Sequence, residues 1–432
     1  LHFLEPYEKS KYLYFRGEPR ERERERERVR HPPIIHQYHA TNMAEESAAA
    51  SFSVQELGIS PEPAGHFKRF HHCQFWVCNA IQAATFYVTR FGFQRVAYRG
   101  LETGNRDIVT HVLRNGNVFF SFSSPLNPGN EAFAEWFKRS GDGVKDVCFE
   151  VDNVRAIYEK AVAAGAESIR EPWEESDADG SVVMATIRTY GDTWHTFVQN
   201  ENFHGFFLPN FKAVEEEDPV SKAFADTKLE FIDHIVGNQD WGQMLDVEKW
   251  YTEKLGFHRF WCVDEKQMHT EFSALRSVVM TDAEENVKMP INEPAKGKRK
   301  SQIEEFVEYY GGPGVQHIAL RTYDILHSVS ALRSRGLKFL SVPKAYYDDL
   351  RERLARSSVE VKEDINKIED LNILVDFDEK GYLLQIFTKP VEDRPTLFIE
   401  IIQRANHEGF GVGNFKALFE SIERDQAERG NL

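Results

Sequence analysis

The stretch GPGVQHIALRTYDI, residues 312–325, has the same pattern as an earlier stretch of the chain, GDGVKDVCFEVDNV, residues 141–154. In each, a turn with glycines leads into an apolar run of the length of a β-strand. There are three further pairs, and all four pairs come in the same order in the two parts of the chain. The three are FYVTRFGFQRV (86–96) with WYTEKLGFHRF (250–260), VLRNGNVFFSF (112–122) with ALRSVVMTDAE (274–284), and AAGAESI (163–169) with SRGLKFL (334–340). Four landmarks in one order indicate two homologous halves of roughly 160 residues each.

Each half contains the same succession of predicted elements twice, namely a strand, a helix and several further strands. The first units begin at FHHCQFWV and FIDHIVGN, and the second units begin at VCFEVDNVRAIYEKAVAAGA and HIALRTYDILHSVSALRSRGL. This succession predicts an α+β fold of two homologous domains, each built from paired βαβββ units that wrap a curved sheet around a cavity.

Changes in composition predict the domain boundaries. The run RERERERERVR at residues 20–30 alternates in charge and has no apolar period, so we expect residues 1–65 to form a disordered or extended N-terminal tail. The segment PNFKAVEEEDPVSKAFADTK, residues 209–228, is acidic and polar and contains proline, which is typical of a linker. The two domains are therefore expected at residues 66–208 and 229–432.

Charge and cysteine content exclude several classes of function. A formal net charge of −16, with a single basic cluster at residues 296–300, argues against a nucleic-acid partner. The four cysteines show neither CxxC spacing nor the density of a secreted disulfide scaffold, which favours a reducing compartment; they are Cys73, Cys78, Cys148 and Cys262. Because the chain has no long apolar run and no charged-then-apolar leader, we expect no membrane span, no secretory signal and a cytoplasmic location.

Three polar residues interrupt predicted strands of the second half. They are His234 in IDHIVGN, His317 in VQHIALRT and Glu400 in PTLFIEIIQR, and successive members lie 83 positions apart (317 − 234 and 400 − 317). A buried carboxylate is very costly unless it is paired or bound to a metal. Two histidines and one carboxylate that leave one side open form the ligand set of non-haem Fe(II) oxygenases, whereas the absence of thiolates argues against a structural zinc site.

The aligned positions of the first half form a poor metal set. Asp146 aligns with His317, Gln199 in TWHTFVQN aligns with Glu400, and His71 or His72 falls near His234. We therefore predict that the first half keeps the fold without the metal.

A simpler interpretation treats each polar residue separately. A single histidine in a strand is more often a hydrogen-bonded core residue than a ligand, and Glu400 could pair with an arginine such as Arg394 or Arg404. The metal hypothesis is favoured because the three interruptions fall at matching places in the repeat.

Several long motifs resemble one known family. IDHIVGNQ, FHRFW, MPINEPAKGKRKSQIEEFVEYYGGPGVQHIAL, GYLLQIFTKPVEDRPTLFIEIIQR and GFGVGNFKALFESIERDQAERGNL closely resemble the 4-hydroxyphenylpyruvate dioxygenases of the vicinal oxygen chelate superfamily. The resemblance covers about residues 50–432, both halves in order, and shows no departure at the candidate metal positions. It implies that the second domain is the catalytic one and that the first is non-catalytic.

The resemblance also implies roles for individual residues. The metal ligands would be His234, His317 and Glu400. The polar side of the substrate pocket would be formed by Ser277, Asn292, Gln302, Gln316 and Gln385, and the aromatic side by Phe387, Phe398 and Phe410. Strand alternation supports a shared face for Phe398 and Glu400, and for Gln385 and Phe387, but it turns Gln316 away from His317 unless the strand is bulged there.

The C-terminal segment has the pattern of an amphipathic helix. Asn414 is expected to cap it, and Phe415, Leu418, Phe419 and Ile422 follow the apolar stripe of a packed helix. The resemblance implies that this helix, with Asn414 and Phe415 at its start, acts as a gate over the cavity mouth.

The function implied by the resemblance is the conversion of 4-hydroxyphenylpyruvate and O2 to homogentisate and CO2 in tyrosine and phenylalanine catabolism, with one Fe(II) per chain and a homodimeric assembly. Hydroxymandelate synthase is the closest alternative, since it shares fold, metal and substrate. A ring-cleaving dioxygenase, a glyoxalase-type metalloenzyme and a metal-free binding protein of the same fold are the others. Product analysis distinguishes the enzymes, and loss of a ligand would mark the binding protein.

Overall fold

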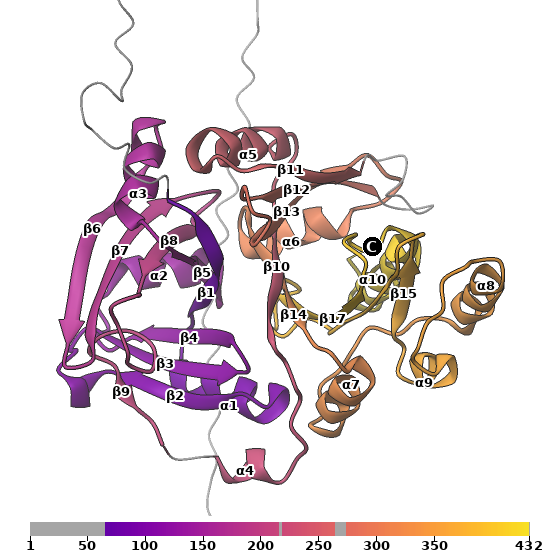
Figure 1. Ribbon diagram of the computed structural model, residues 1–432, viewed down its shortest axis with the longest axis horizontal. Helices are drawn as coiled ribbons and strands as arrows, with labels where there is room; N and C mark the ends of the chain where they lie inside the picture. Colours follow the sequence, from indigo (N-terminus) through magenta and orange to yellow (C-terminus); the bar gives the residue numbers. More distant parts are fainter. Residues whose placement is uncertain (1–64, 216–217, 264–273, 432) are drawn as a thin grey trace, which may run out of the picture. The chain divides into compact units, whose positions relative to one another are not determined.

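The computed structural model describes residues 65–215, 218–263 and 274–431. The predicted N-terminal tail lies outside these residues, apart from its last one. The described strands form two sheets (Figure 1). The first sheet has nine strands in the order β6-β7-β8-β5-β1-β4-β3-β2-β9, and the second has eight in the order β11-β12-β13-β10-β14-β17-β16-β15.

The first sheet is built from the first half of the repeat. Its strands are β1 (Phe67–Trp76), β2 (Gln94–Arg99), β3 (Ile108–Asn115), β4 (Val118–Pro125), β5 (Gly143–Val151), β6 (Ser168–Asp177), β7 (Gly180–Arg188), β8 (Trp194–Gln199) and β9 (Lys212–Ala213). Its helices are α1 (Ala80–Phe91), η2 (Leu101–Thr103), α2 (Glu131–Arg139) and α3 (Val154–Ala163). The last strand and the short helix α4 (Pro219–Lys222) fall within the segment expected as a linker.

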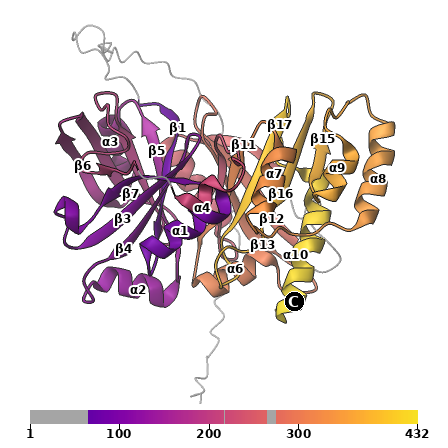
Figure 2. The same cartoon turned by 90° about the horizontal axis from the view of Figure 1, so that it is seen from below.

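The second sheet is built from the second half. Its strands are β10 (Phe231–Asn238), β11 (His258–Val263), β12 (Ala274–Thr281), β13 (Lys288–Ala295), β14 (Gly314–Arg321), β15 (Leu374–Phe377), β16 (Tyr382–Phe387) and β17 (Phe398–Ala405). Its helices are α5 (Met244–Trp250) with the π-helical turn η3 (Tyr251–Leu255), α6 (Gln302–Tyr310), α7 (Ile325–Ser334), α8 (Lys344–Ala355), α9 (Ile365–Asp370), η4 (Val412–Asn414) and α10 (Phe415–Arg429). Helices α7, α8 and α9 lie outside the curve of this sheet (Figures 1 and 2).

The two sheets share one topology at their centres. In the first, β1 pairs antiparallel with β5, and each of these has a parallel outer neighbour, β4 and β8. In the second, β10 and β14 pair in the same way and have β13 and β17 as parallel neighbours. Parallel neighbours require a crossover, which the helix of each unit provides. The predicted α+β class and the repeated half are confirmed.

The glycines of the aligned GF landmarks end corresponding helices. Gly92 follows α1 with a φ of 73°, and Gly256 follows η3 with a φ of 72°. Both lie in the left-handed region, where glycine has no steric penalty. This pair was aligned correctly.

A different landmark was aligned wrongly. The strands β3 and β12 occupy the same place in their sheets, and Thr281 pairs with His258 as Arg114 pairs with Gln94, so the counterpart of Ala274 is Asp107. The sequence comparison matched Ala274 with Val112 instead. The error arises because residues 116–117 join β3 to β4, whereas residues 282–287 join β12 to β13, and alternating apolar residues align equally well in more than one register.

Corresponding β-bulges interrupt the central pairing of both sheets. In β10–β14, Ile232 pairs with Leu320 and His234 with Ala319, which leaves Asp233 as an extra residue. In β14, Gln316 is extra for the same reason. The first sheet has extra residues at the corresponding positions, His71 in β1 and Lys145 in β5. Because a bulge adds a residue to one strand, it redirects the side chains around it.

Contacts between the halves follow the repeat as well. The Arg90 guanidinium at the end of α1 donates to the carbonyl of Arg335 after α7. Lys254, the counterpart of Arg90, donates to the carbonyl of Ala164 after α3. Each half therefore caps a helix terminus of the other, which satisfies carbonyl groups that the helices leave open.

Among the helices of the described residues, none combines the length and apolar character that crossing a bilayer requires.

Candidate metal centre and substrate cavity

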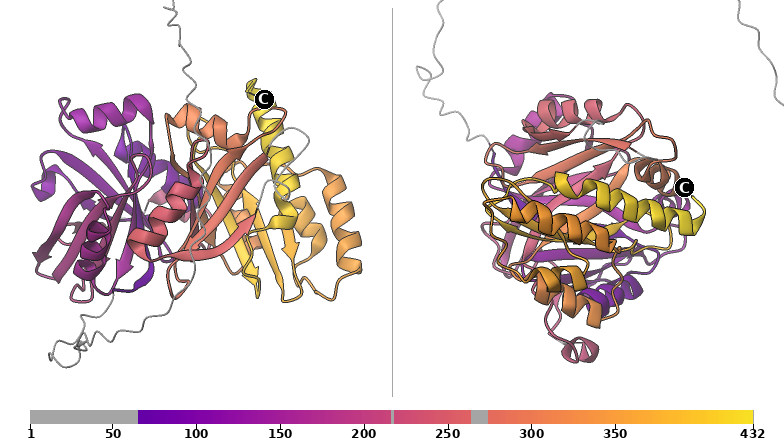
Figure 3. Two further views of the ribbon diagram at one scale, coloured as in Figure 1. Left: turned by 90° about the horizontal axis from the view of Figure 1, so that it is seen from above. Right: turned by 90° about the vertical axis from the view of Figure 1, so that its right-hand side faces the viewer.

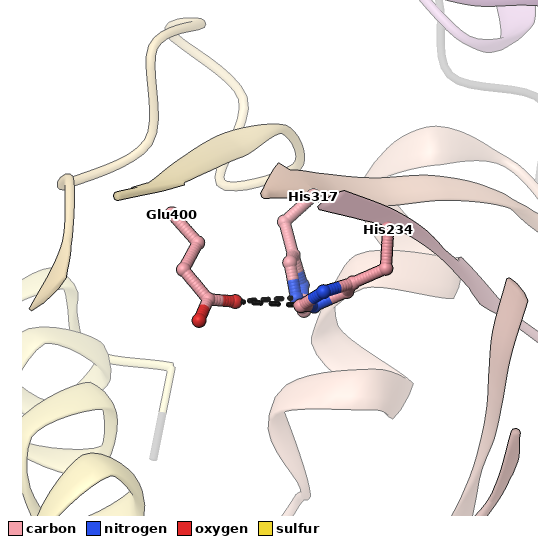
Figure 4. A group of neighbouring side chains, drawn as sticks. All are labelled: His234, His317 and Glu400. Atoms are coloured by element: carbon pink, nitrogen blue, oxygen red, sulfur yellow. Dashed lines mark ion pairs between the residues drawn. The ribbon is translucent and has the colours of Figure 1, made fainter. Parts of the chain in front are cut away.

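Three strands of the second sheet bring His234, His317 and Glu400 together (Figure 4). One Glu400 oxygen, Oε2, lies 3.3 Å from His234 Nε2 and 3.4 Å from His317 Nε2. Each residue offers one ligand atom, and these atoms all lie within 4.8 Å of one another. The pairing of β14 with β17 explains the convergence, because it sets Ala319 opposite Glu400, two residues beyond His317 on the same face.

The chemistry of this group fits a divalent metal ion. Glu400 and His234 are almost fully buried, at 2% and 3% exposure. Burial alone would raise the pKa of Glu400, but His234 and His317 hold it below its usual value. Two imidazoles and an ionised carboxylate that converge on one point are a set of donors for a borderline metal. Within the described residues this is the one group of histidine, cysteine and acidic side chains with such geometry.

Both imidazoles have their second nitrogen engaged. His234 Nδ1 lies 2.8 Å from Asp233 Oδ1, and His317 Nδ1 lies 3.0 Å from Gln316 Oε1. With Nδ1–H donated to these oxygens, each Nε2 is left as an acceptor that faces the centre of the group. In both cases the residue that accepts this hydrogen bond is the bulged residue directly before the histidine.

The trio lies at one wall of a cavity enclosed by the second sheet, which apolar and aromatic side chains line together with a few polar ones. The helix α10 lies across this cavity within the curve of the sheet (Figure 3). Most of the residues predicted to contact substrate line it, namely Ser277, Asn292, Gln302, Gln316, Phe387, Phe398 and Phe410, and so does Phe415 of the predicted gate helix.

Gln316 belongs to this cavity because of the bulge in β14. A regular strand would send Gln316 and His317 to opposite faces. The extra residue lets both side chains face the cavity, where the Gln316 amide also accepts from His317.

Aromatic rings surround the three candidate ligands. Phe398 stacks on His317 with ring centroids 4.8 Å apart, and Phe387 meets Phe398 edge to face at 6.0 Å. On the other side Phe410 meets His234 at 5.1 Å. The predicted aromatic side of the pocket is thus formed by residues that also pack against the ligands.

Two predicted residues are absent from the cavity lining, although Gln385 shares a face of β16 with Phe387, which lines it. Gln385 is not among the residues lining the cavity; its amide lies against the backbone of Gly411, where an added Cβ would be 2.3 Å from Gln385 Nε2. Asn414 occupies the N-cap position of α10 but makes no capping hydrogen bond. Its Oδ1 instead accepts from the Tyr346 hydroxyl at 2.7 Å. The expected cap is therefore wrong, whereas the apolar stripe of α10 is buried as predicted.

The strand registers correct one pairing between the halves. Cys148 lies opposite His72 and Thr196, as Ala319 lies opposite His234 and Glu400. The counterparts of the trio are therefore His72, Asp146 and Thr196. Gln199 is not the counterpart of Glu400 but of Gln403, since each accepts from the first N–H of a helix in its own half, α3 for Gln199 and α7 for Gln403.

The first-half group satisfies itself with hydrogen bonds. Asp146 accepts from the Thr196 hydroxyl at 2.5 Å and from its backbone N–H at 3.0 Å. Burial raises the pKa of Asp146 to about 6 and lowers that of His72 well below its usual value. These are the properties of a core polar pair.

Sequence comparison missed a buried ion-pair group behind His234. Asp233 accepts from Arg404 at 2.9 Å and from Arg321 at 3.1 Å. Burial alone would raise the pKa of Asp233, but Arg404 and His234 hold it well below its usual range. The pairing of Glu400 with Arg394 or Arg404 is wrong, because Arg404 pairs with Asp233 and Arg394 donates to backbone carbonyls. The available signal was an acidic residue directly before a candidate ligand.

Known proteins are similar in sequence to this chain over most of its length. The model of the Glyoxalase/Bleomycin resistance protein/Dioxygenase superfamily matches residues 69–195 and 232–386. The 4-hydroxyphenylpyruvate dioxygenase of Danio rerio is 56% identical over 381 residues, which are 88% of this chain and 96% of that protein. That of Dictyostelium discoideum is 56% identical over 364 residues, or 84% and 99%. The chain belongs to the 4-hydroxyphenylpyruvate dioxygenase family.

A solved structure within the superfamily shares the fold. A mutant of 4-hydroxymandelate synthase from Streptomyces coelicolor superimposes with a TM-score of 0.73 at 30% identity, covering 84% of this chain and 99% of that one. The 4-hydroxyphenylpyruvate dioxygenases are more similar in sequence to this chain than this synthase is, so the chain is assigned to their family. The predicted family and enzyme class, a dioxygenase, are confirmed.

Proposed function

We propose that the chain converts 4-hydroxyphenylpyruvate and O2 to homogentisate and CO2, with one Fe(II) held by His234, His317 and Glu400. The observation that supports it most strongly is the convergence of these three side chains inside an aromatic cavity. Membership of a family whose members carry this name supports the substrate. This reaction belongs to the catabolism of tyrosine and phenylalanine.

Fe(II), when bound, supplies a Lewis-acidic and redox-active centre with positions open to ligands other than protein. The protein's own task is to hold the substrate beside it. Phe387, Phe398 and Phe410 form apolar walls against which a phenol ring packs. The hydroxyl of Ser277 and the amides of Asn292, Gln302 and Gln316 offer hydrogen bonds to the carboxylate and phenol ends.

The helix α10 excludes water from the reacting groups. Phe415, Leu418 and Phe419 line the cavity from this helix and close it with apolar surface. We propose that Phe415 and the start of α10 form the gate through which substrate enters. Asn414 serves this gate by holding the start of the helix to Tyr346.

Product analysis tests the proposal. The purified chain, loaded with Fe(II) and incubated with 4-hydroxyphenylpyruvate in air, is expected to give homogentisate, identified by mass spectrometry and NMR. The alternative activity, hydroxylation of the benzylic carbon, is favoured by the likeness to 4-hydroxymandelate synthase. Formation of 4-hydroxymandelate as the sole product would contradict the proposal and support that alternative.

We further propose a homodimer in the cytoplasm. The three cysteines with described side chains, Cys73, Cys78 and Cys148, are free thiols, which supports a reducing compartment. Light scattering after size exclusion tests the oligomeric state, and a monomer at micromolar concentration would contradict it.

A further inference from the structure

A charged group lies directly behind the first metal ligand. Asp233 precedes His234 in β10, and its side chain is 7% exposed. It accepts from His234 Nδ1 through Oδ1 at 2.8 Å. Arg404 donates to both carboxylate oxygens, with Nη2 at 2.9 Å from Oδ1 and Nε at 3.0 Å from Oδ2, and Arg321 donates to Oδ2 at 3.1 Å. One carboxylate is therefore held by three donors.

The geometry of the pairing leaves Asp233 little freedom. The two-point contact with Arg404 fixes the plane of the carboxylate, because a guanidinium and a carboxylate match in only one orientation. Arg404 is itself held by the carbonyl of His407 and by that of Gly409. A carboxylate fixed in this way restricts the rotation of the imidazole that donates to it.

Arg404 also connects the group to the cavity wall. Its guanidinium lies 5.4 Å from the centroid of the Phe410 ring, and the Phe410 ring in turn lies 5.1 Å from that of His234. Asp233, Arg404, Phe410 and His234 thus form a closed circuit of contacts. One set of ion pairs bears on both a metal ligand and an aromatic wall of the cavity.

The first half of the molecule shows that the fold does not need this group. The registers place His71, Glu150 and Asn200 at the positions of Asp233, Arg321 and Arg404. There His71 contacts His72 at 2.7 Å and Glu150 is paired with Arg69. The bulge is present in both halves, but the ion-pair group occurs only where the three candidate ligands occur.

We propose that Asp233, clamped by Arg321 and Arg404, is a positioning residue that fixes His234 with its proton on Nδ1 and its Nε2 directed at the metal. Through Arg404 the same group sets the position of Phe410. This inference rests on the proposed metal site and adds to it the residues that hold its first ligand in place.

Cobalt binding tests the proposal without requiring turnover. Metal-free protein is titrated with Co(II), and the visible absorption of the bound ion reports both affinity and ligand geometry. Asp233→Asn is expected to weaken Co(II) binding about 10- to 100-fold and to change the shape of the visible band. The matched variant His71→Asn, at the corresponding bulge of the first half, is expected to leave affinity and band unchanged.

The outcomes separate this inference from the metal site itself. A folded Asp233→Asn protein that binds Co(II) within twofold of the wild type, with the same band, would overturn the inference alone. If Asp233→Asn does not fold, Arg321→Gln takes its place, since Arg404 still neutralises Asp233; several-fold weaker binding supports the proposal and unchanged binding overturns it. A wild-type chain that binds no Co(II) would overturn the proposed site and this inference together.

Discussion

At the scale of single residues, the metal centre balances burial against charge. Glu400 stays ionised in an apolar strand because two imidazoles face it, and His317 is held between the Phe398 ring and the Gln316 amide. Each imidazole of the candidate centre is thus held by the residue before it, His234 by Asp233 and His317 by Gln316. Such preorganisation lowers the cost of assembling a site.

Removal of one ligand is expected to abolish metal binding without unfolding the chain. In His317→Ala the cavity gains space that water can fill, so the fold persists while two ligands remain for the ion. Iron content by atomic absorption and homogentisate formation should both fall below detection. A His317→Ala protein with normal iron content would contradict the ligand assignment; Asp146→Asn, at the corresponding position of the first half, is the control and should retain both.

The same control residue carries a pH prediction. Burial raises the pKa of Asp146 to about 6 in the folded chain, above its ordinary value of about 3.8. The folded state therefore binds the proton more tightly, and its stability falls as pH rises from about 4 to about 6, by up to about 3 kcal/mol. Asp146→Asn lacks this loss. Denaturant unfolding at pH 4.5 and pH 7 should show the variant gaining on the wild type at the higher pH, and an equal difference at both would contradict the prediction.

The trio could be predicted from the sequence because each member is a polar residue in an otherwise apolar strand and the repeat aligns all three. Asp233 and Gln316 could be assigned their places only from the structure, since alternation gives no sign of a bulge. Gln199 was paired with Glu400 because both lie near the end of a unit, but the strand register depends on loop lengths that the sequence leaves open.

At the scale of elements, the C-terminal helix is held at both ends. Its start is fixed by Asn414 and Tyr346. Its end is fixed by Arg429, which donates to both oxygens of the buried Glu305 at 3.1 and 2.9 Å and also contacts Asp425. The apolar stripe of α10 was predictable from its period, whereas the polar attachments depend on residues of α6 and α8 far away in the sequence.

Loosening the far end of α10 is expected to open the cavity. Arg429→Gln leaves Glu305 short of a cationic partner at a site that is 3% exposed, which costs about 1–3 kcal/mol. Hydrogen exchange of α10 should quicken at least about fivefold, while exchange of β10 and β14 stays unchanged. Lys416→Gln, which alters an exposed pair on the same helix, is the control. Unchanged exchange in α10 would contradict the attachment.

At the scale of the whole molecule, arginine side chains of one half donate hydrogen bonds to carbonyl groups at helix ends of the other half. Arg335 is 4% exposed and donates to the carbonyls of Thr89, Ser221 and Ala225. The repeat itself was predictable, since glycine turns and helix ends recur in order. The contacts between the halves could not be predicted, because the sequence pattern of one half does not show which groups of the other half lie against it.

Arg335→Ala is expected to weaken the contact between the two halves. Several carbonyls lose their donor at once, which should lower the free energy of unfolding by about 1–3 kcal/mol and raise hydrogen exchange at the end of α1 in the other half. Arg333→Ala removes a donor to Leu371 within the second half and should leave α1 unaffected. Equal exchange at α1 in both variants would contradict the role of Arg335.

The repeated bulges have a consequence for how such a chain tolerates insertion and deletion. His317 and Val315 pair with the consecutive residues Val236 and Gly237, and Gln316 between them has no partner in the ladder. A codon at that position can therefore be gained or lost without shifting any paired residue, and the same holds for Asp233. Each bulge is a place where a lineage adds a side chain beside a candidate ligand while the hydrogen-bonded ladder on either side keeps its registration.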